Sequence, residues 1–422
     1  MRLWAAQSIS IFGTHITAIA MPLLAVTTLD ASPFEMGVLT AAATLPYLLL
    51  GLFVGVWVDQ LRKRPLLIIA DVGRAVCLLA IPVAAVLDQL SITLLVVTAF
   101  VHGTLAMLFD VADTTYLPSL VRRDQLVEAN GKLELSTSLA QISGPALAGS
   151  LVSLLTAPFA LLIDSVSYLA SAFMLGKIEH IEEAPERRPH ESLKSQIRDG
   201  VSTIRNSSVL SALISASALS AGFGELFLAV YVLFLSGDLD LGAGRIGLVF
   251  ALGGLGALLG AWSSGPLSRR IGSGNTAVIG LLFFGITGLF IPAALLVPSI
   301  GFELIAVCEF LQWGFFVLYQ VQAASIRQAY TPLQALGRVQ ASSLLAIRGS
   351  MPIGALLGGV IASFIGPAWT LVVAESGMLM SVIPLLLAPI RSIRTLAESI
   401  EEEADQSATM PRLPEAEIES PA

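Results

Sequence analysis

Residues 55–64 read Gly-Val-Trp-Val-Asp-Gln-Leu-Arg-Lys-Arg and form a short polar break between two long apolar segments. The break joins one carboxylate, Asp59, to three clustered cations in a chain where only 13% of residues are charged. A degenerate copy, Gly-Pro-Leu-Ser-Arg-Arg-Ile-Gly, occupies residues 265–272, almost half of the 422-residue chain further on. A repeat at half the chain length predicts two related halves, each with a polar break at the same place.

The composition indicates an integral membrane protein. Apolar residues make up 55% of the chain and the mean hydropathy is +0.81, whereas soluble domains have roughly 45–50% apolar and about 25% charged residues. Both cysteines, Cys77 and Cys308, lie in apolar runs, which argues against a disulfide framework or a metal cluster. The net charge of −8 comes mostly from the acidic stretch after Glu398. The remaining body is nearly neutral, which argues against nucleic-acid binding.

A helix that crosses a bilayer needs about 20 mostly apolar residues, and twelve runs approach or exceed that length. They cover about residues 4–28, 36–58, 65–87, 91–115, 133–157, 159–176, 208–235, 245–267, 274–296, 299–325, 340–365 and 368–390. Similar breaks at Pro158 and Pro367 close the fifth and eleventh runs. We therefore predict an all-α membrane protein with two pseudo-symmetric six-helix bundles.

The predicted organisation has four parts. Residues 1–176 form the first bundle, 177–207 a linker, 208–390 the second bundle, and 391–422 an acidic, disordered tail. The second part of the linker has apolar residues at helical spacing. It is predicted either to lie as an amphipathic helix on the membrane surface or to dock on the bundle as a solvated connector.

The positions of Lys and Arg predict the orientation, because cytoplasmic loops retain them. The loops after even-numbered runs hold nearly all of these cations, whereas the loops after odd-numbered runs hold only Arg245. We therefore expect both termini in the cytoplasm of a multi-pass protein of the cell (inner) membrane.

Two six-helix halves with a Gly-x-x-x-Asp break before helix three resemble the major facilitator superfamily over about residues 3–394. Gly55 and Asp59 match that superfamily's signature loop, whereas Gln60 stands where a cation is usual and Arg62 where a glycine is usual. In the second copy Arg269 replaces the expected acid. The resemblance implies the major facilitator fold and a transport function.

A second resemblance points to export. Residues 140–149, Ala-Gln-Ile-Ser-Gly-Pro-Ala-Leu-Ala-Gly, are similar to the antiporter motif of proton-driven exporters, with Gly144, Pro145 and Gly149 in place. Residues 120–131 are similar to the corresponding loop of macrolide-efflux and enterobactin exporters. Gly and Ala let membrane helices approach closely, and Pro permits a kink.

The resemblance also implies a cytoplasmic gate. Asp59 is expected to face the start of helix eleven near Arg338, where a helix end and a cation each stabilise a carboxylate modestly. Asp113 and Asp110 are expected to pair with Lys63 and Arg64. The alternative is a topology-setting loop with one incidental acid and separately solvated charges.

Ionisable residues at membrane depth are functional candidates, and in the superfamily helices 1, 4, 7 and 10 line the cavity. The candidates for proton coupling on these helices are Glu225, Glu309, Asp110 and His15. An apolar environment disfavours a charged carboxyl, so such a group can take up a proton and later release it. The alternative is a protonated or paired group that only holds helices together.

Three further sets of charged residues are expected to be structural or unassigned. Asp71 and Arg74 have helical spacing and can pair on helix three. Asp164 and Glu375 occupy repeat-equivalent positions and are expected to act as structural caps. Arg348 needs a counter-charge, for which Glu309 is one candidate.

Aromatic residues are expected to supply an adaptable apolar binding surface, although some aromatics face lipid. The candidates for the cavity wall are Phe223, Phe227, Phe310, Trp313 and Tyr319.

The chain lacks a nucleotide-binding loop and the motifs of metalloproteases, serine hydrolases and dithiol oxidoreductases. We therefore expect no enzyme activity and no cofactor or metal. The predicted function is a monomeric secondary carrier that exports amphipathic small molecules, drugs or a siderophore-like natural product, by proton antiport. The alternatives are an importer or specific metabolite carrier of the same fold, and a non-transporting membrane receptor.

Overall fold

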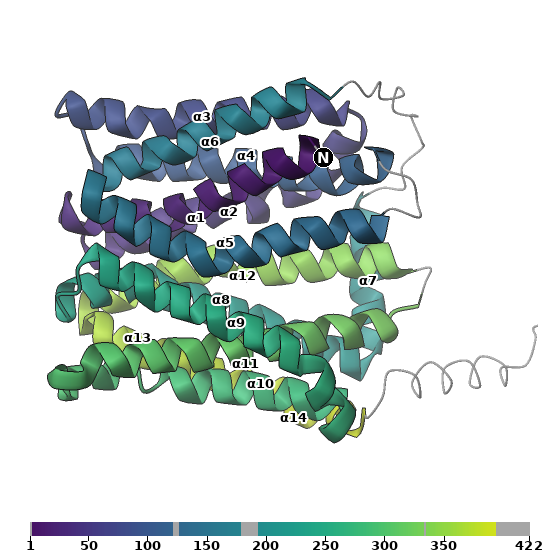
Figure 1. The fold of residues 1–422 in the computed structure, drawn as a ribbon. Coiled ribbons are helices and arrows are strands. Elements are labelled where there is room, and N and C mark those ends of the chain that lie inside the picture. Colours follow the sequence, from purple (N-terminus) through teal and green to yellow (C-terminus); the bar gives the residue numbers. More distant parts are fainter. Residues whose placement is uncertain (1, 121–125, 179–192, 333–334, 394–422) are drawn as a thin grey trace, which may run out of the picture.

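The computed structural model describes residues 2–120, 126–178, 193–332 and 335–393 (Figure 1). Twelve helical segments in these ranges are long and apolar enough to cross a membrane, and the ranges contain no strand. The predicted all-α membrane fold is therefore confirmed. The acidic tail predicted to be disordered lies outside the described residues after position 393.

The first half contains six helices. They are α1 (Arg2–Thr27), α2 (Pro33–Asp59), α3 (Lys63–Val86), α4 (Ile92–Leu120), α5 (Leu126–Leu155) and α6 (Ala157–Gly176). The helix α7 (Leu193–Asn206) belongs to the linker. The second half contains α8 (Ser208–Leu233), α9 (Ala243–Ile271), α10 (Ser273–Gly288), α11 (Gly301–Ala329), α12 (Leu336–Ile365), α13 (Pro367–Met380) and α14 (Ile383–Leu387). Short π or 3-10 turns extend α8 and α10, and another precedes α11.

The polar breaks of the sequence become helix ends with defined local causes. Ser32 caps α2: its hydroxyl accepts the Glu35 N–H, and the Glu35 carboxylate accepts the Ser32 N–H at 2.8 Å. The chain enters α6 and α13 through residues with positive φ, Thr156 at 71° and Gly366 at 79°, each followed by a proline in the first turn. Proline suits this position because its fixed φ is helical and the first turn needs no N–H donor.

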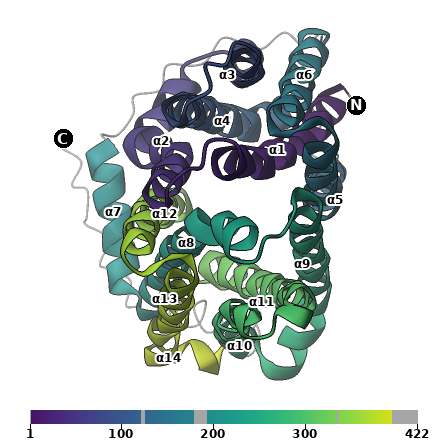
Figure 2. The ribbon, with the colours of Figure 1, turned by 90° about the vertical axis from the view of Figure 1, so that its left-hand side faces the viewer.

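We call the end of the bundle that carries α7 the linker end, at the right in Figure 1, and the opposite end the hairpin end. Figure 2 looks along the helices from the hairpin end and shows the α1–α6 half above the α8–α14 half. The halves meet where α2 lies beside α12 and where α5 lies beside α9.

Among the described residues, the core that the two halves share lies at the hairpin end. One cluster of buried apolar residues there contains side chains from both halves, including Leu24, Met36, Tyr231 and Ile246. Towards the linker end, the first half has its own core around Tyr116 and the second half has another around Tyr319. The halves are therefore joined at one end and packed separately at the other.

The linker helix α7 contacts the bundle. A Cβ atom at Gly200 would lie 2.4 Å from the backbone oxygen of Arg338 and 2.4 Å from the Ser342 hydroxyl. Only glycine allows this approach of α7 to the first turns of α12. Of the two predicted placements of the linker, this contact corresponds to docking on the bundle; the side chains of residues 193–197 lie outside the described part.

Candidate functional site

A cavity of about 450 Å³ lies between the two halves. Its walls come from α1, α2, α4 and α5 on one side and from α8, α9 and α11 on the other. Ile19, Met21 and Leu39 belong both to the wall and to the shared core of the hairpin end. The shared core therefore forms the closed end of the cavity.

The cavity wall is mainly apolar with a small number of polar groups, which is the usual composition of a site for an organic small molecule. The polar or ionisable side chains of the wall are Thr14, His15, Thr17, Thr40, Thr44, His102, Gln141 and Glu225. The indole of Trp313 and the ring of Phe250 add aromatic surface. Each half contributes at least one ionisable group.

Glu225 is the carboxyl group of the cavity wall. It lies on α8 with only 8% of its surface exposed, and its Oε2 atom has no hydrogen-bond partner among the described residues. Arg348 on α12 is the cation within electrostatic range of this carboxyl. Burying a carboxyl oxygen without a donor is costly when the group is charged, so the surroundings of Glu225 favour a bound proton.

Glu309 lies behind the wall. It is 1% exposed on α11, and its two oxygens accept hydrogen bonds from the Tyr231 hydroxyl at 2.8 Å and the Trp313 indole N–H at 2.9 Å. Gly253 on α9 makes room for this pair, because a Cβ there would lie 2.7 Å from the indole. Trp313 therefore separates Glu309 from the cavity and connects the two through one hydrogen bond.

The antiporter-like motif lies where α5 contacts α1 and α9. A Cβ at Gly144 would lie 2.6 Å from the Cβ of His15, which faces the cavity beside Pro145. A Cβ at Gly149 would lie 2.9 Å from the Cα of Gly247 on α9. The small residues of the motif therefore allow α5 to contact helices of both halves.

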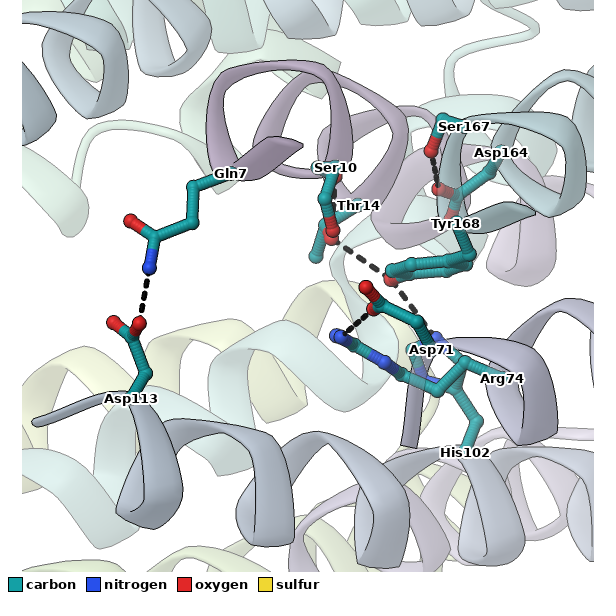
Figure 3. Close-up of polar contacts among 10 residues, drawn as sticks. All are labelled: Gln7, Ser10, Thr14, Asp71, Arg74, His102, Asp113, Asp164, Ser167 and Tyr168. Atoms are coloured by element: carbon teal, nitrogen blue, oxygen red, sulfur yellow. Dashed lines mark hydrogen bonds and ion pairs between the residues drawn. The ribbon is translucent and has the colours of Figure 1, made fainter. Parts of the chain in front are cut away.

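A buried polar network connects α3 to the cavity wall (Figure 3). Arg74 forms an ion pair with Asp71, and its guanidinium lies between the rings of Phe109 and Tyr168 at 4.3 and 4.2 Å from their centroids. The Tyr168 hydroxyl is hydrogen-bonded to Thr14 at 2.9 Å and to His102 at 3.2 Å.

Thr14 and His102 both line the cavity, so the network reaches it. The spacing of Asp71 and Arg74 predicts their pairing, but a single sequence carries no signal for the link through Tyr168 on α6.

The repeat-equivalent acids connect neighbouring helices. Asp164 on α6 accepts hydrogen bonds from Thr17 on α1 and, at 2.9 Å, from Ser167 (Figure 3 shows the Ser167 contact). Glu375 on α13 accepts one from the Gln312 amide on α11 at 2.7 Å. Each acid therefore holds an outer helix on a helix that contributes to the cavity wall.

Four of the five aromatic candidates lie away from the central cavity, and only Trp313 lines it. Phe223 packs against α13, where a Cβ at Gly377 would lie 2.1 Å from its ring. Phe227 packs against Tyr231 with ring centroids 4.4 Å apart and the rings tilted by 37°, and Phe310 is half-buried on α11. Tyr319 is fully buried in the linker-end core, where its hydroxyl is 2.7 Å from Ser217.

The gate candidates at the linker end make several contacts. Lys63 donates to the backbone oxygens of Val58 and Leu61, and Arg64 donates to that of Leu175 at 3.0 Å. The surroundings of Gly55 and the side chain of Asp59 lie outside the described part of the structure.

Asp113 and Arg338 also have described partners. Asp113 accepts a hydrogen bond from the Gln7 amide (Figure 3). Arg338 forms an ion pair at 3.4 Å with Asp199, which lies on the linker helix α7.

Arg348 and Asp110 are linked through Tyr47. The Arg348 guanidinium lies 5.0 Å from the centroid of the Tyr47 ring, and the Tyr47 hydroxyl donates to Asp110 at 2.9 Å. These three residues come from α12, α2 and α4, so the chain of contacts crosses between the halves. The oxygens of Glu309, the predicted candidate partner of Arg348, accept hydrogen bonds from Tyr231 and Trp313 instead.

Comparison with known proteins identifies related exporters. The family model of transmembrane secretion effectors matches residues 1–416. The chain is 24% identical over 406 residues to macrolide efflux protein A of Streptococcus pyogenes, which covers 93% of this chain and 96% of that protein. It is 24% identical over 392 residues to the enterobactin exporter of Shigella dysenteriae. That alignment covers 90% of this chain and 89% of that protein.

Among solved structures, a bacterial homologue of the iron transporter ferroportin in its inward-facing state has a TM-score of 0.77 to this chain. The likeness covers 93% of this chain and 98% of that protein at 16% sequence identity. At this identity the comparison shows a common fold.

Proposed function

Since the chain belongs to the transmembrane secretion effector family of the major facilitator superfamily, we propose that it exports amphipathic small molecules by alternating access. The observation that carries the proposal is the cavity of about 450 Å³ between the halves, to which both halves contribute wall residues. Transporters built from two related halves bind their substrates at such an interface and expose the site alternately to each side.

The distribution of the cores supports a loading conformation. The halves share a core at the hairpin end and have separate cores at the linker end. The excess of Lys and Arg in the linker-end loops predicts that this end is cytoplasmic. In the proposed cycle this structure therefore faces inward and receives its substrate from the cytoplasm.

The cavity wall supports an amphipathic organic substrate. Apolar side chains and the Trp313 indole would bind an apolar body, and the Thr, Gln141 and Glu225 groups would bind a few polar atoms. Within the described ranges, no group of three His, Cys, Asp or Glu residues could hold a metal ion. The two relatives with 24% identity are named for export of a macrolide and of enterobactin, and this supports export over import.

We assign proton coupling first to Glu225. Its buried position disfavours the charged form, its Oε2 atom has no donor among the described residues, and the residue lines the cavity. A substrate that donates to this oxygen, or water that enters on outward opening, would favour release of the proton. Glu309 is the second candidate, because it is buried and one hydrogen bond joins its carboxyl group to Trp313 of the cavity wall.

Inverted membrane vesicles with an imposed pH gradient test both parts of the proposal. We expect a radiolabelled macrolide or an amphipathic fluorescent dye to accumulate when the lumen is acidic, and accumulation to collapse when the gradient is removed. Glu225→Gln should keep substrate binding, because the amide has a similar size and can still form hydrogen bonds. It should abolish the gradient-driven part of uptake, because Gln cannot take up and release a proton. Glu303→Gln, near the hairpin end of α11, is the control and should keep the gradient-driven part of uptake.

Three outcomes would contradict the proposal. Absence of flux for all probes would argue for a receptor. Accumulation in right-side-out vesicles would argue for import. Full gradient dependence in Glu225→Gln and in Glu309→Gln would show that the coupling assignment is wrong while leaving export intact.

A further inference from the structure

A second cavity, of about 150 Å³, lies between α8, α11 and α12. On α8 it begins at Ser217, whereas the central cavity begins at Glu225, about 12 Å further from the linker end at the helical rise. On α11 it extends from Phe316 to Arg327, again nearer to the linker end than Trp313. In the proposed inward-facing state it therefore lies nearer to the cytoplasmic side than the central cavity does.

One face of α11 supplies an aromatic ring, an amide and a guanidinium to this cavity. Phe316, Gln320 and Arg327 are four and seven residues apart and lie on the same side of the helix. Ser217 and Ser220 of α8 lie opposite. Their hydroxyls are already engaged, Ser217 with Tyr319 at 2.7 Å and Ser220 with the Ser217 backbone oxygen at 3.0 Å.

Arg327 is the unusual member of the set. It is half-buried, and its Nε atom is buried without a hydrogen-bond partner among the described residues. The described residues of the cavity wall include no carboxylate. By contrast, Arg74 is paired with Asp71 between two rings, and Arg348 lies over the Tyr47 ring.

A partly buried cation without a counter-charge is unfavourable unless an anion or water occupies its surroundings. A guanidinium presents a planar fork of donors that fits a carboxylate or a phosphate through two parallel hydrogen bonds. Gln320 adds an amide donor, and the Phe316 ring adds an apolar surface next to it. The arrangement fits an anionic oxygen group attached to a flat apolar body.

We propose that this cavity is an entry subsite for the anionic group, a carboxylate or a phosphate, of a substrate that approaches from the linker end. Arg327 binds the anion, Gln320 donates a further hydrogen bond, and Phe316 contacts the adjoining apolar part. The inference rests on the proposed export function and narrows its substrate class to amphipathic molecules with an acidic group.

Binding of a matched pair of small probes tests the subsite directly. The purified full chain in phosphatidylcholine nanodiscs is titrated with benzoate and with benzamide, which has a similar shape without the charge. We expect benzoate to bind more tightly, and Arg327→Gln to weaken benzoate binding by about tenfold or more, because charge-assisted hydrogen bonds are lost. Benzamide binding should change little.

Two further variants make the result specific. Arg327→Lys keeps the charge but loses the planar fork, so it should bind benzoate with intermediate affinity. Arg270→Gln removes an exposed cation at the linker end of α9 and should bind benzoate like the natural chain. Equal affinities for benzoate and benzamide, or equal losses in Arg327→Gln and Arg270→Gln, would overturn the proposal.

A lipid phosphate could supply the same anion chemistry. Titration in nanodiscs that contain phosphatidylglycerol distinguishes the two sources. Unchanged benzoate affinity supports a substrate group as the ligand. A large loss of benzoate affinity caused by phosphatidylglycerol, and absent in Arg327→Gln, would show that a lipid headgroup occupies the site. That result would overturn the substrate assignment.

A transport measurement separates failure of this inference from failure of the proposed function. In inverted vesicles, a carboxylated fluorescent dye and its neutral methyl ester are compared. Arg327→Gln should lower the initial rate for the acid several-fold and leave that for the ester unchanged. Equal transport rates of both dyes in the natural chain and in Arg327→Gln would overturn the subsite proposal but not the proposed export function. No transport of either dye would contradict the export function itself.

Discussion

Arg74 shows how this fold holds a full charge inside the membrane. Its guanidinium is 5% exposed and is held by the Asp71 carboxylate and the faces of Phe109 and Tyr168. Cation–π contacts are strongest when the partners are desolvated. The charge is therefore stabilised by two kinds of partner. Tyr168 also connects Arg74 to the cavity wall, because its hydroxyl is hydrogen-bonded to Thr14 and His102.

Removing one partner of this pair should destabilise the protein more than removing both. Arg74→Leu leaves the Asp71 carboxylate buried without its cation, at a cost of about 3–5 kcal/mol. We expect a clear fall in the thermal unfolding midpoint of the purified protein in detergent, and a partial recovery in the double variant Asp71→Leu/Arg74→Leu. Arg269→Leu, at an exposed position, should leave the midpoint unchanged. A double variant no more stable than the single one would count against this account.

Individual charged residues were predictable from the sequence, but their surroundings were not. Glu225 and Glu309 are both candidates by depth in the membrane, yet only Glu225 reaches the cavity. Glu309 is bonded to Trp313, four residues on along the same helix, and to Tyr231, 78 positions away. Helical spacing makes the first contact predictable, whereas the second depends on how α8 packs on α11.

The contact between α5 and α9 joins the halves at the hairpin end. A Cβ at Gly247 would lie 2.5 Å from the Pro145 oxygen and 2.8 Å from the Cα of Gly149. The two backbones therefore touch through glycines, as small residues allow in membrane helices. The same arrangement brings Gly37 of α2 close to Gly359 of α12.

A single methyl group should loosen this contact. In Gly247→Ala the new Cβ must push α5 away from α9, so the hairpin end closes less well and export slows several-fold. Gly244→Ala, one turn earlier on α9, is a matched control, because its Cβ would meet only the Ser153 hydroxyl at 3.4 Å. Transport rates per inserted protein check the pair; equal rates would show that close backbone approach is not needed for cycling.

The helices themselves were predictable in number and approximate position, because each apolar run approaches or exceeds the length that crosses a bilayer. Their ends were less so: α4 continues to Leu120 and α11 to Ala329, beyond the apolar runs that predicted them. Which face each helix turns inward was not predictable. Helices that are apolar all round carry no periodic signal for a buried face, so Phe223 and Tyr319 were candidates for a wall that neither reaches.

The arrangement of the cores makes the two ends of the molecule different, and this difference can be measured. In the structure the central cavity is closed by the shared core at the hairpin end. Ala43 of α2 is exposed inside this cavity, and Gln89 is exposed in the hairpin between α3 and α4. A small membrane-impermeant thiol reagent should therefore reach these two positions from different sides.

Single cysteines in a chain without Cys77 and Cys308 test this. Ala43→Cys should react quickly in inverted vesicles and slowly in intact cells if the resting protein has the proposed inward-facing conformation. Gln89→Cys should show the reverse and serves as the orientation control. Fast labelling of Ala43→Cys from the Gln89 side would mean that the resting state opens at the hairpin end.

The shared core has a thermodynamic consequence for the resting equilibrium. If the cycle opens the hairpin end, Leu24, Met36 and the residues packed on them lose apolar contacts and meet water. Exposure of apolar surface raises the heat capacity. The equilibrium between the two conformations should therefore follow a curved, not a straight, van't Hoff plot, and the preference for either state should vary with the temperature at which the cell grows.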